Sequence, residues 1–339
     1  MIYVMPTIDV EAAHGSAPFE QLIEGRIGTT DDWGVYRQAR LFQSFGVSAV
    51  FFVDVYEALL WGEQRFAELC QKLDEMGQDV QLHTHPSWRT DPRDNKSLQA
   101  YKRSRCQFPP ERDFMAKLTQ REQIEFLERG IHYFQRWLGR KPIAHRSGGY
   151  SINNDTIEAL AHTGIRLDSS MHPACKNTKA NWGLNRIEKK RGVIQFPVTV
   201  MNLQVTPAAH GFAKQNLLKT DIDSVSHRDM IAFLRQSLRK NVRIMNLFMH
   251  SYSLLEMNGD FSILRPSPRK LKYLSETLRF CSEEPRVQFV NAGQFLEAYD
   301  ADPHRFAGPD SIPTVWSPGT FSRLAYRKIR RHFFPPNAA

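Results

Sequence analysis

Short apolar runs alternate with helical stripes along the first part of the chain. Residues 2–9 and 47–53 are apolar runs of strand length, and the second is continuous enough for a strand buried on both faces. Residues 36–45 and 65–76 instead carry apolar side chains three or four positions apart, and a glycine closes each stripe. This alternation predicts strand–helix–strand units.

The same alternation continues beyond these units. We expect further strands over residues 79–85, 142–146, 165–168, 193–200, 243–249 and 287–290. We expect further helices over residues 119–138, 154–163, 228–238, 269–280 and 293–299. The repeated order predicts an α/β fold with a mainly parallel sheet, either an open doubly wound sheet or a closed barrel. We interpret residues 1–300 as one domain with decorated loops, followed by an extension over residues 301–339.

The composition excludes several classes of protein. The longest apolar run, residues 47–53, is far shorter than the ~20 residues that cross a bilayer. The first residues hold neither a basic segment nor a small-residue cleavage site, so we expect a cytoplasmic protein. The four cysteines form no CxxC pair, which argues against a zinc ribbon or a disulfide scaffold.

The positive charge is concentrated at the C-terminus. The chain has a formal net charge of +9, and residues 311–339 hold five basic residues and no acidic one. The rest of the chain is only mildly basic, so we expect no nucleic-acid partner. Residues 321–334 carry an apolar stripe flanked by the arginines. Two interpretations stay open: a helix on the anionic inner face of a membrane, or a helix docked on the outside of the domain.

Carboxylates and imidazoles stand at the ends of predicted strands. Asp9 and Glu11 are two positions apart at the end of the first strand, so their side chains share one face. His83 and His85 repeat this spacing at the end of another strand. Two imidazoles and a carboxylate form a set that binds a divalent metal and leaves a position open. A solvated strand end is the alternative for the two carboxylates.

Two more strands end in polar residues. Arg146 precedes Gly148 and Gly149, which allow a tight turn or a close approach to a ligand. An arginine at such a turn needs a carboxylate partner, and Asp168, at the end of the next short strand, is the natural candidate. His250 ends another apolar run. Packing alone does not produce a series of strands that each end in a residue of catalytic type.

Together these segments resemble the five-motif pattern of the polysaccharide deacetylases, the NodB-homology fold of carbohydrate esterase family 4. The resemblance covers roughly residues 1–300 and rests on the order of segments 7–11, 46–53, 82–86, 146–150, 167–170 and 248–250. It implies a distorted (β/α)₇ barrel with its site at the C-terminal ends of the strands. It also implies one divalent ion, usually zinc, and the removal of an N- or O-acyl group.

The resemblance implies roles for individual residues. Asp9 matches the general base that takes a proton from the attacking water, and Arg146 matches the arginine that holds it, with Asp168 as a neighbour in the fourth motif. His250 matches the general acid that protonates the departing amine. A nearby backbone N–H, in the turn from Arg146 to Tyr150, is the expected oxyanion donor.

The metal ligands depart from the family pattern. His83 matches the first metal histidine, but Val10 stands where the family carries a metal aspartate, and Glu11 is the candidate replacement. The second histidine of the family falls at Ser87, so His85 has to take its place. These two departures concern the metal geometry rather than the fold.

The substrate expected from the resemblance is an N-acylated sugar of a polysaccharide, a lipopolysaccharide or its precursor. Tyr150, Trp88 and His14 are candidate substrate-binding residues, because they follow or flank the motifs. Two alternatives stay open. One is a metal-independent amide or formamide hydrolase of the same superfamily, and the other is an inactive barrel that binds glycan.

Overall fold

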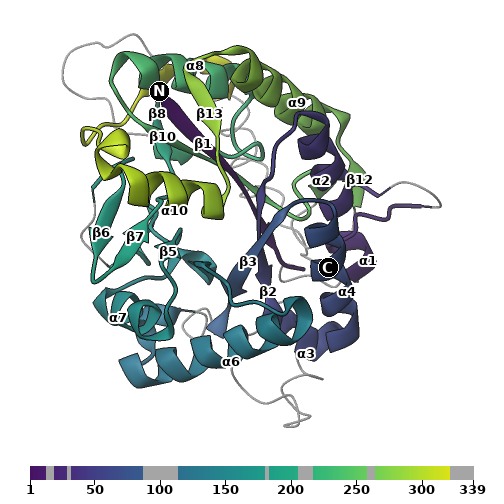
Figure 1. Cartoon of the computed structure of the whole chain (residues 1–339). Coiled ribbons are helices and arrows are strands. Elements are labelled where there is room, and N and C mark those ends of the chain that lie inside the picture. The colour runs from purple at the N-terminus through teal and green to yellow at the C-terminus, as the bar shows by residue number, and fades with distance from the viewer. Residues whose placement is uncertain are drawn as a thin grey trace, which may run out of the picture.

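A nine-stranded sheet forms the centre of the molecule (Figure 1). The computed structural model describes residues 1–12, 19–28, 32–86, 114–179, 183–204, 217–257 and 264–320. Within them the strands lie in the order β10 (Ile244–His250), β1 (Ile2–Val10), β2 (Val50–Asp54), β3 (Asp79–Thr84), β4 (Ala144–Ser147), β5 (Leu167–Asp168), β7 (Val193–Gln195) and β6 (Glu188–Lys190), and β13 (Val287–Phe289) pairs with β1. Every pair in this sheet is parallel except β6 with β7. The predicted mainly parallel α/β fold is confirmed.

The sheet curls into a half-barrel, and hydroxyl groups join its open side. The hydroxyls of Thr199 and Thr220 lie 2.7 Å apart, and Thr199 Oγ1 accepts a hydrogen bond from the backbone N–H of Asn246 at 3.1 Å. The backbone N–H of Phe248 donates to the carbonyl of Thr220 at 2.9 Å. We call Thr199, Thr220 and Asn246 the threonine seam. It links β10 to the chain that follows β7, which gives the distorted barrel that the sequence predicts.

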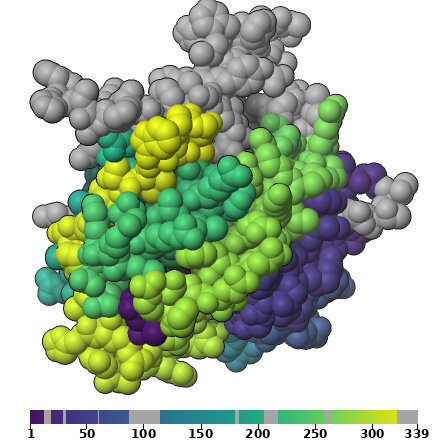
Figure 2. Space-filling view, turned by 90° about the horizontal axis from the view of Figure 1, so that it is seen from above, coloured from purple at the N-terminus to yellow at the C-terminus, as the bar shows by residue number. Residues whose placement is uncertain are grey.

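Helices cover the outer face of the sheet. The main ones are α2 (Val35–Ser44), α4 (Glu63–Glu75), α6 (Gln120–Leu138), α7 (Asn154–Thr163), α8 (His227–Arg239) and α9 (Pro268–Glu283), with the shorter α1 (Phe19–Leu22) and α3 (Ala58–Trp61). Figure 2 shows α8 and α9 side by side on one face of the molecule. Apolar side chains from these helices and from the outward positions of the strands form the larger core.

The inner face of the strands changes from apolar to polar along their length. On β1, Tyr3 and Met5 belong to a second core inside the barrel, whereas Thr7 and Asp9 share their face further along. Helix α10 (Ala292–Ala301) contributes Phe295 to this inner core and so fills the end of the barrel that the strands start from. On β1 the inward polar groups therefore lie toward the C-terminal mouth.

The helix ends follow from local sequence. Thr119 and Glu122 form a capping box at the start of α6, and Asn153 forms one with Thr156 at the start of α7. Both helices end at a glycine in the left-handed region, which a side chain would strain. These contacts are local, so the predicted ranges for both helices agree closely with the structure.

The single strand predicted over residues 193–200 is wrong. The chain leaves the main sheet after β7, near Pro197, which lacks the backbone N–H that a ladder needs. A separate three-stranded sheet then forms from β8 (Val200–Gln204), β9 (Leu217–Lys219) and β14 (Thr314–Trp316), and a small two-stranded sheet from β11 (Leu255–Met257) and β12 (Leu264–Pro266). The first of these extends the wall of the barrel mouth.

The segment after residue 300 is described as far as residue 320. The pairing of β14 with β8 attaches residues 314–316 to the body of the molecule. The domain boundary at residue 300 stays a prediction, and the basic stripe over residues 321–334 lies outside the described residues. In the part of the chain that the structure describes, no helix is both long enough and apolar enough to cross a membrane.

Candidate active site

Four strands bring polar side chains to the barrel mouth. Asp9 lies on β1, His83 on β3, Arg146 on β4, and His250 ends β10. Asp9 and His250 are Cα partners in the pairing of β1 with β10, as are His83 and Arg146 in that of β3 with β4. Because neighbouring residues in register point to the same face, these four side chains meet inside the mouth.

Glu11, His83 and His85 bring three potential metal ligands together, and we call these residues the metal side. Glu11 Oε2 lies 2.8 Å from His85 Nε2 and 3.3 Å from His83 Nε2. The three ligand atoms lie within 4.8 Å of one another. Val10, the residue at the usual ligand position, points into the outer core. The alternation of β1 therefore gives Glu11, rather than residue 10, access to the mouth.

The backbone around the two histidines fixes how they face the mouth. His83 Nδ1 lies 2.7 Å from the carbonyl oxygen of Arg146, so this nitrogen carries the proton and donates it. Nε2, on the Glu11 side, is then the nitrogen available as a ligand. A Cβ at Gly148 would lie 2.4 Å from the ring of His85. Only glycine at this position lets β4 pack so closely against that imidazole.

The electrostatics of the metal side favour positive charge between the ligands. Burial raises the pKa of Glu11, but the charge of His85 and hydrogen bonds from both histidines outweigh it and hold that pKa well below its usual range. Burial lowers the pKa of His83, yet Asp9 and Glu11 outweigh it and raise that pKa overall. The buried carboxylates thus attract protons to the imidazoles, and a divalent cation would satisfy the same need. The residues present fit such an ion.

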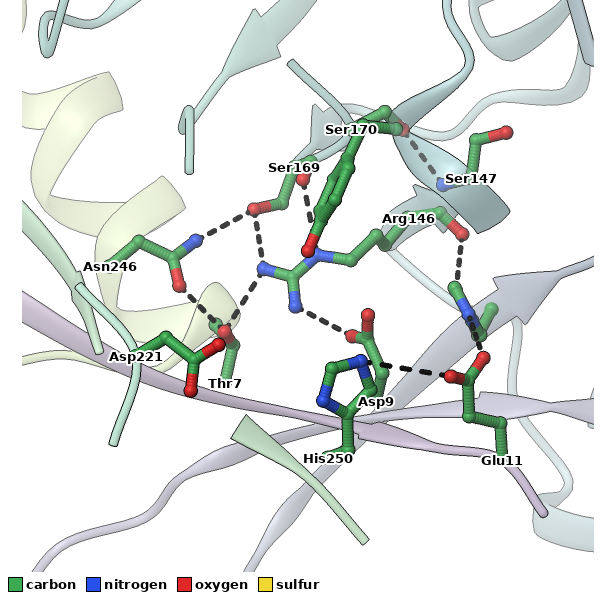
Figure 3. A network of polar contacts seen from close by, with 12 residues as sticks. Thr7, Asp9, Glu11, Arg146, Ser147, Ser169, Ser170, Asp221, Asn246 and His250 are labelled. Carbon is green, nitrogen blue, oxygen red and sulfur yellow. Dashed lines mark hydrogen bonds and ion pairs between the residues drawn. The ribbon is translucent and has the colours of Figure 1, made fainter. Parts of the chain in front are cut away.

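Arg146 lies at the centre of the site and is fully buried (Figure 3). Its Nη1 donates to Asp9 Oδ1 at 2.6 Å, and its Nη2 donates to Thr7 Oγ1 at 3.0 Å and to Ser169 Oγ at 2.8 Å. Its Nε donates to the carbonyl of Ser169 at 3.1 Å. This network fixes the guanidinium, and the guanidinium in turn fixes one oxygen of Asp9.

The predicted pairing of Arg146 with Asp168 is not formed. Asp168 is the Cα partner of His145, so it lies on the face of β4 opposite to the Arg146 side chain. Its carboxylate oxygens lie 3.0 Å from His145 Nδ1 and 2.7 Å from Ser170 Oγ, and Gln195 Nε2 donates to it. Asp168 therefore supports the strand behind the site, while Arg146 pairs with the aspartate of the first strand.

His250 faces the mouth from the end of β10. Its Nε2 lies 3.7 Å from Glu11 Oε1, and its side chain is 20% exposed. The ring stacks on Tyr252 with centroids 4.9 Å apart. Within the described residues its Nδ1 is buried without a hydrogen-bond partner. This imidazole can exchange protons with solvent while its orientation is fixed by stacking.

Several residues that orient the metal side could not be inferred from motifs. The Tyr252 hydroxyl donates to Glu11 Oε1 at 3.3 Å, and Ser251 Oγ donates to the Glu11 carbonyl at 2.8 Å. Glu57 accepts from the backbone N–H of Ala12 with both oxygens, at 2.9 and 2.8 Å. Each of these contacts joins segments that are distant in sequence or sit in loops. The only hint of these residues in the sequence is that Ser251 and Tyr252 directly follow His250.

A further group lies across the mouth, and of its members Tyr150 was expected from the sequence, whereas Lys219 and Asp221 were missed. Lys219, at the end of β9, donates to the Tyr150 hydroxyl at 2.8 Å and lies 3.0 Å from Asp221 Oδ2. We call Tyr150, Lys219 and Asp221 the lysine side. In Figure 3, Asp221 lies on one side of Asp9 and Arg146, and Glu11 lies on the other. The predicted residues His14 and Trp88 lie outside the described residues.

The arrangement combines a group that can accept a proton, a group that can donate one and a ligand set whose metal ion could polarise a carbonyl. Asp9 presents a carboxylate fixed by Arg146, His250 presents a partly exposed imidazole, and the metal side presents a ligand set beside them. Acyl-transfer hydrolysis needs these three capacities: a proton acceptor for water, a proton donor for the leaving group and an electrophile.

No family model and no curated protein matches this chain. Among solved structures, it is similar to a Mycobacterium smegmatis protein assigned as a polysaccharide deacetylase, with a TM-score of 0.58 and 17% identity over 92% of this chain and 93% of that one. It is also similar to Puue allantoinase, with a TM-score of 0.51 and 12% identity over 90% of this chain and 92% of that one. At these identities the similarity concerns the fold, and the predicted deacetylase fold is confirmed.

Proposed function

We propose that this protein is a metal-dependent hydrolase that removes an N-acyl group from a sugar of a polysaccharide, a lipopolysaccharide or its precursor. One observation carries the proposal: Glu11, His83 and His85 bring their ligand atoms within 4.8 Å of one another, beside an aspartate that is held by a buried arginine. The fold shared with the Mycobacterium smegmatis protein supports the same reaction class.

The metal side would hold one divalent ion. Two imidazole nitrogens and a carboxylate oxygen form the ligand set of many catalytic zinc sites. When bound there, such an ion supplies a Lewis acid that polarises the acyl carbonyl and makes water more acidic. Tyr252 and Ser251 keep Glu11 oriented toward the two histidines, and the Arg146 carbonyl keeps the Nε2 of His83 available.

Asp9 is the proposed general base. Its Oδ1 accepts a hydrogen bond from Arg146 at 2.6 Å, which leaves Oδ2 to take the proton of the attacking water. The pairing thus separates two tasks, since one oxygen positions the group and the other accepts the proton.

His250 is the proposed general acid. It ends the strand paired with that of Asp9, so the two groups reach a bound amide from neighbouring strands. Its Nε2 is the nitrogen on the Glu11 side, and the partly exposed ring can be reprotonated by solvent between turnovers. Proton transfer to the departing nitrogen is what amide cleavage requires, because an amide anion is a poor leaving group.

Purification followed by metal analysis and acetate assays tests this proposal. We expect about one equivalent of zinc or another divalent ion per chain, and acetate release from an N-acetylglucosamine tetramer. Glu11→Gln should lose both, whereas Glu256→Gln, at a side chain that is 52% exposed, should lose neither. A chain that binds no divalent metal would overturn the ligand assignment. A chain that releases acetate from none of a panel of acetylated sugars would overturn the function.

A second candidate is a metal-independent amide hydrolase. Two observations favour it: Val10 occupies the usual ligand position, and Puue allantoinase shares the fold. Assays with allantoin and formamides, with and without a chelator, separate the two candidates. Turnover of these amides that persists after metal removal would support the second. Binding of the sugar tetramer without turnover of any acylated compound would instead support an inactive glycan-binding barrel.

A further inference from the structure

Lys219 is half-buried at the barrel mouth, yet no step of the proposed reaction uses it. Its side chain is 18% exposed, and its ammonium group has three N–H donors. One donates to the Tyr150 hydroxyl at 2.8 Å, and Asp221 Oδ2 lies 3.0 Å away. The ammonium also lies 3.7 Å from the centre of the Phe248 ring. The ammonium thus contacts the Tyr150 hydroxyl, the Asp221 carboxylate and the Phe248 ring, and it can orient these groups.

The hydrogen bond from Lys219 determines whether the Tyr150 hydroxyl can still donate or accept a hydrogen bond. The ammonium can only donate, so the phenol oxygen accepts, and the phenol proton remains available. Within the described residues, no side chain or carbonyl accepts that proton. Burial raises the pKa of Tyr150 to about 12, against the opposing effect of Lys219, so the proton is retained at neutral pH.

The backbone of Tyr150 is held in a sparsely populated conformation. Its φ is 57°, in the left-handed region, and the preceding Gly149 has a φ of 59°. Thr178 Oγ1 donates to the Tyr150 carbonyl at 3.2 Å, and Asn177 Nδ2 donates to the Gly149 carbonyl at 3.0 Å. A bulky residue adopts this conformation only where its surroundings impose it. Here they bring the ring against Phe248, with centroids 5.9 Å apart, and close to the charge of Asp9.

The charges nearby indicate what kind of group the hydroxyl would meet. The charge of Lys219 is offset by Asp221, and the charge of Arg146 is offset by Asp9. No positive charge is left over among these residues to bind an anionic group, and the Asp9 carboxylate would repel one. The fitting acceptor is a neutral oxygen. The proposed function places the acyl group at the metal side, so the part of the substrate nearest Tyr150 is the sugar.

We infer that the Tyr150 hydroxyl donates a hydrogen bond to a neutral hydroxyl oxygen of the sugar, and that Lys219 is the positioning residue that directs this proton toward it. The inference rests on the proposed function for the identity of the substrate. The inferred hydrogen bond would make the lysine side a determinant of specificity. It would favour substrates that carry a hydroxyl oxygen beside the acyl group.

Kinetics with the N-acetylglucosamine tetramer test the role of the hydroxyl. Tyr150→Phe should raise KM about 3- to 10-fold, the range for one neutral hydrogen bond, and should change kcat less. The matched control is Tyr299→Phe, whose ring packs on Phe295 and Phe306 at the other end of the barrel and which should leave both constants unchanged. A KM for Tyr150→Phe within twofold of the wild type would overturn the inference.

A double-mutant cycle tests the role of Lys219. Lys219→Met alone leaves Asp221 buried without its cation, so the variant to use combines Lys219→Met with Asp221→Asn. We expect this pair of changes to raise KM as Tyr150→Phe does, and to add less than twofold when Tyr150 is already phenylalanine. Effects that multiply would overturn the positioning role, because they would mean that the lysine acts without the tyrosine.

Measurement of sugar binding by calorimetry separates a failure of the proposed function from a failure of the inference about Tyr150. If the wild-type chain releases no acetate, the proposed function fails, and binding of the deacetylated glucosamine tetramer still tests Tyr150. We expect the wild type to bind this tetramer and Tyr150→Phe to bind it about 3- to 10-fold more weakly. A wild-type chain that does not bind the tetramer, or a variant that binds it equally well, would overturn the inference.

Discussion

Each side of the barrel mouth contains a carboxylate, but the charge of that carboxylate is compensated differently on the two sides. On the metal side, a carboxylate and two imidazole nitrogens point at one another within 4.8 Å, and no lysine or arginine of the described residues forms an ion pair with that carboxylate. On the lysine side, the ammonium of Lys219 already lies 3.0 Å from the carboxylate of Asp221. The first side needs a mobile cation, whereas the second is complete by itself. We therefore propose that the metal side carries out the chemistry and that the lysine side recognises the substrate.

Removal of the metal ligands would have the largest effect. His83→Ala should lose bound metal and reduce acetate release to background, because one of only three ligands is gone. Metal content by mass spectrometry and acetate release measure the two losses. His304→Ala, at an exposed residue of the 3₁₀-helix η6 (Pro303–Phe306), should retain both. Full activity in His83→Ala would remove the basis for distinguishing the two sides.

Removal of the proposed base should be the next largest effect. Asp9→Asn keeps the shape of the side chain but cannot take a proton, so kcat/KM should fall about 10²- to 10⁴-fold. Metal content should stay near that of the wild type, which separates this variant from His83→Ala. Asp300→Asn, at an exposed surface ion pair, is the matched control. An Asp9→Asn enzyme with unchanged kcat/KM would show that another group accepts the proton.

Arg146 lies between the two sides (Figure 3), and its loss should lower the free energy of unfolding. Arg146→Met leaves Asp9 buried without its partner, which costs about 3–5 kcal/mol of unfolding free energy. Urea unfolding followed by circular dichroism measures the change. Arg166→Met breaks a pair with Asp300 in which both side chains are about half exposed, so it should cost less than about 1 kcal/mol. Similar costs for the two variants would contradict a buried central network.

The smallest effect concerns the pH dependence of stability next to the lysine side. Burial, together with the charge of Lys219, lowers the pKa of His172 to about 4, and its ring lies 4.8 Å from that of Tyr150. The unfolded chain binds a proton there at about pH 6.5, so stability is full above that pH and falls as the pH drops toward 4. Between pH 7.5 and 5 the loss is on the order of 2 kcal/mol.

The variant His172→Asn should lose this part of the pH dependence. Urea unfolding at the two pH values measures it, and His304→Asn, at an exposed position, controls for the loss of a histidine. If His172→Asn and the wild type lose equal stability between the two pH values, this histidine is not the group that titrates.

The sequence predicted those parts of the site that depend on the alternation of a single strand. Asp9 with Glu11, and His83 with His85, were found because residues two apart share a face whatever the strand pairs with. Asp168 was paired with the wrong residue because its face depends on the register between β4 and β5, which no local pattern encodes. Lys219 was missed because the small sheet that carries it is held by β8 and β14, more than a hundred residues apart in the chain.

The threonine seam has a consequence for how the substrate range of this fold can change. In a closed barrel, strand number and shear fix the radius, so the opening cannot widen without a change in the whole ladder. Here Thr199 connects to β10 through its hydroxyl and Thr220 through its backbone carbonyl, so a few local contacts rather than a continuous ladder close the gap. Substitutions in the seam would therefore alter which substrates fit while β1, β3 and β4 keep their register. The substrate range could therefore change during evolution through substitutions in the seam, without a change in the residues at the metal side.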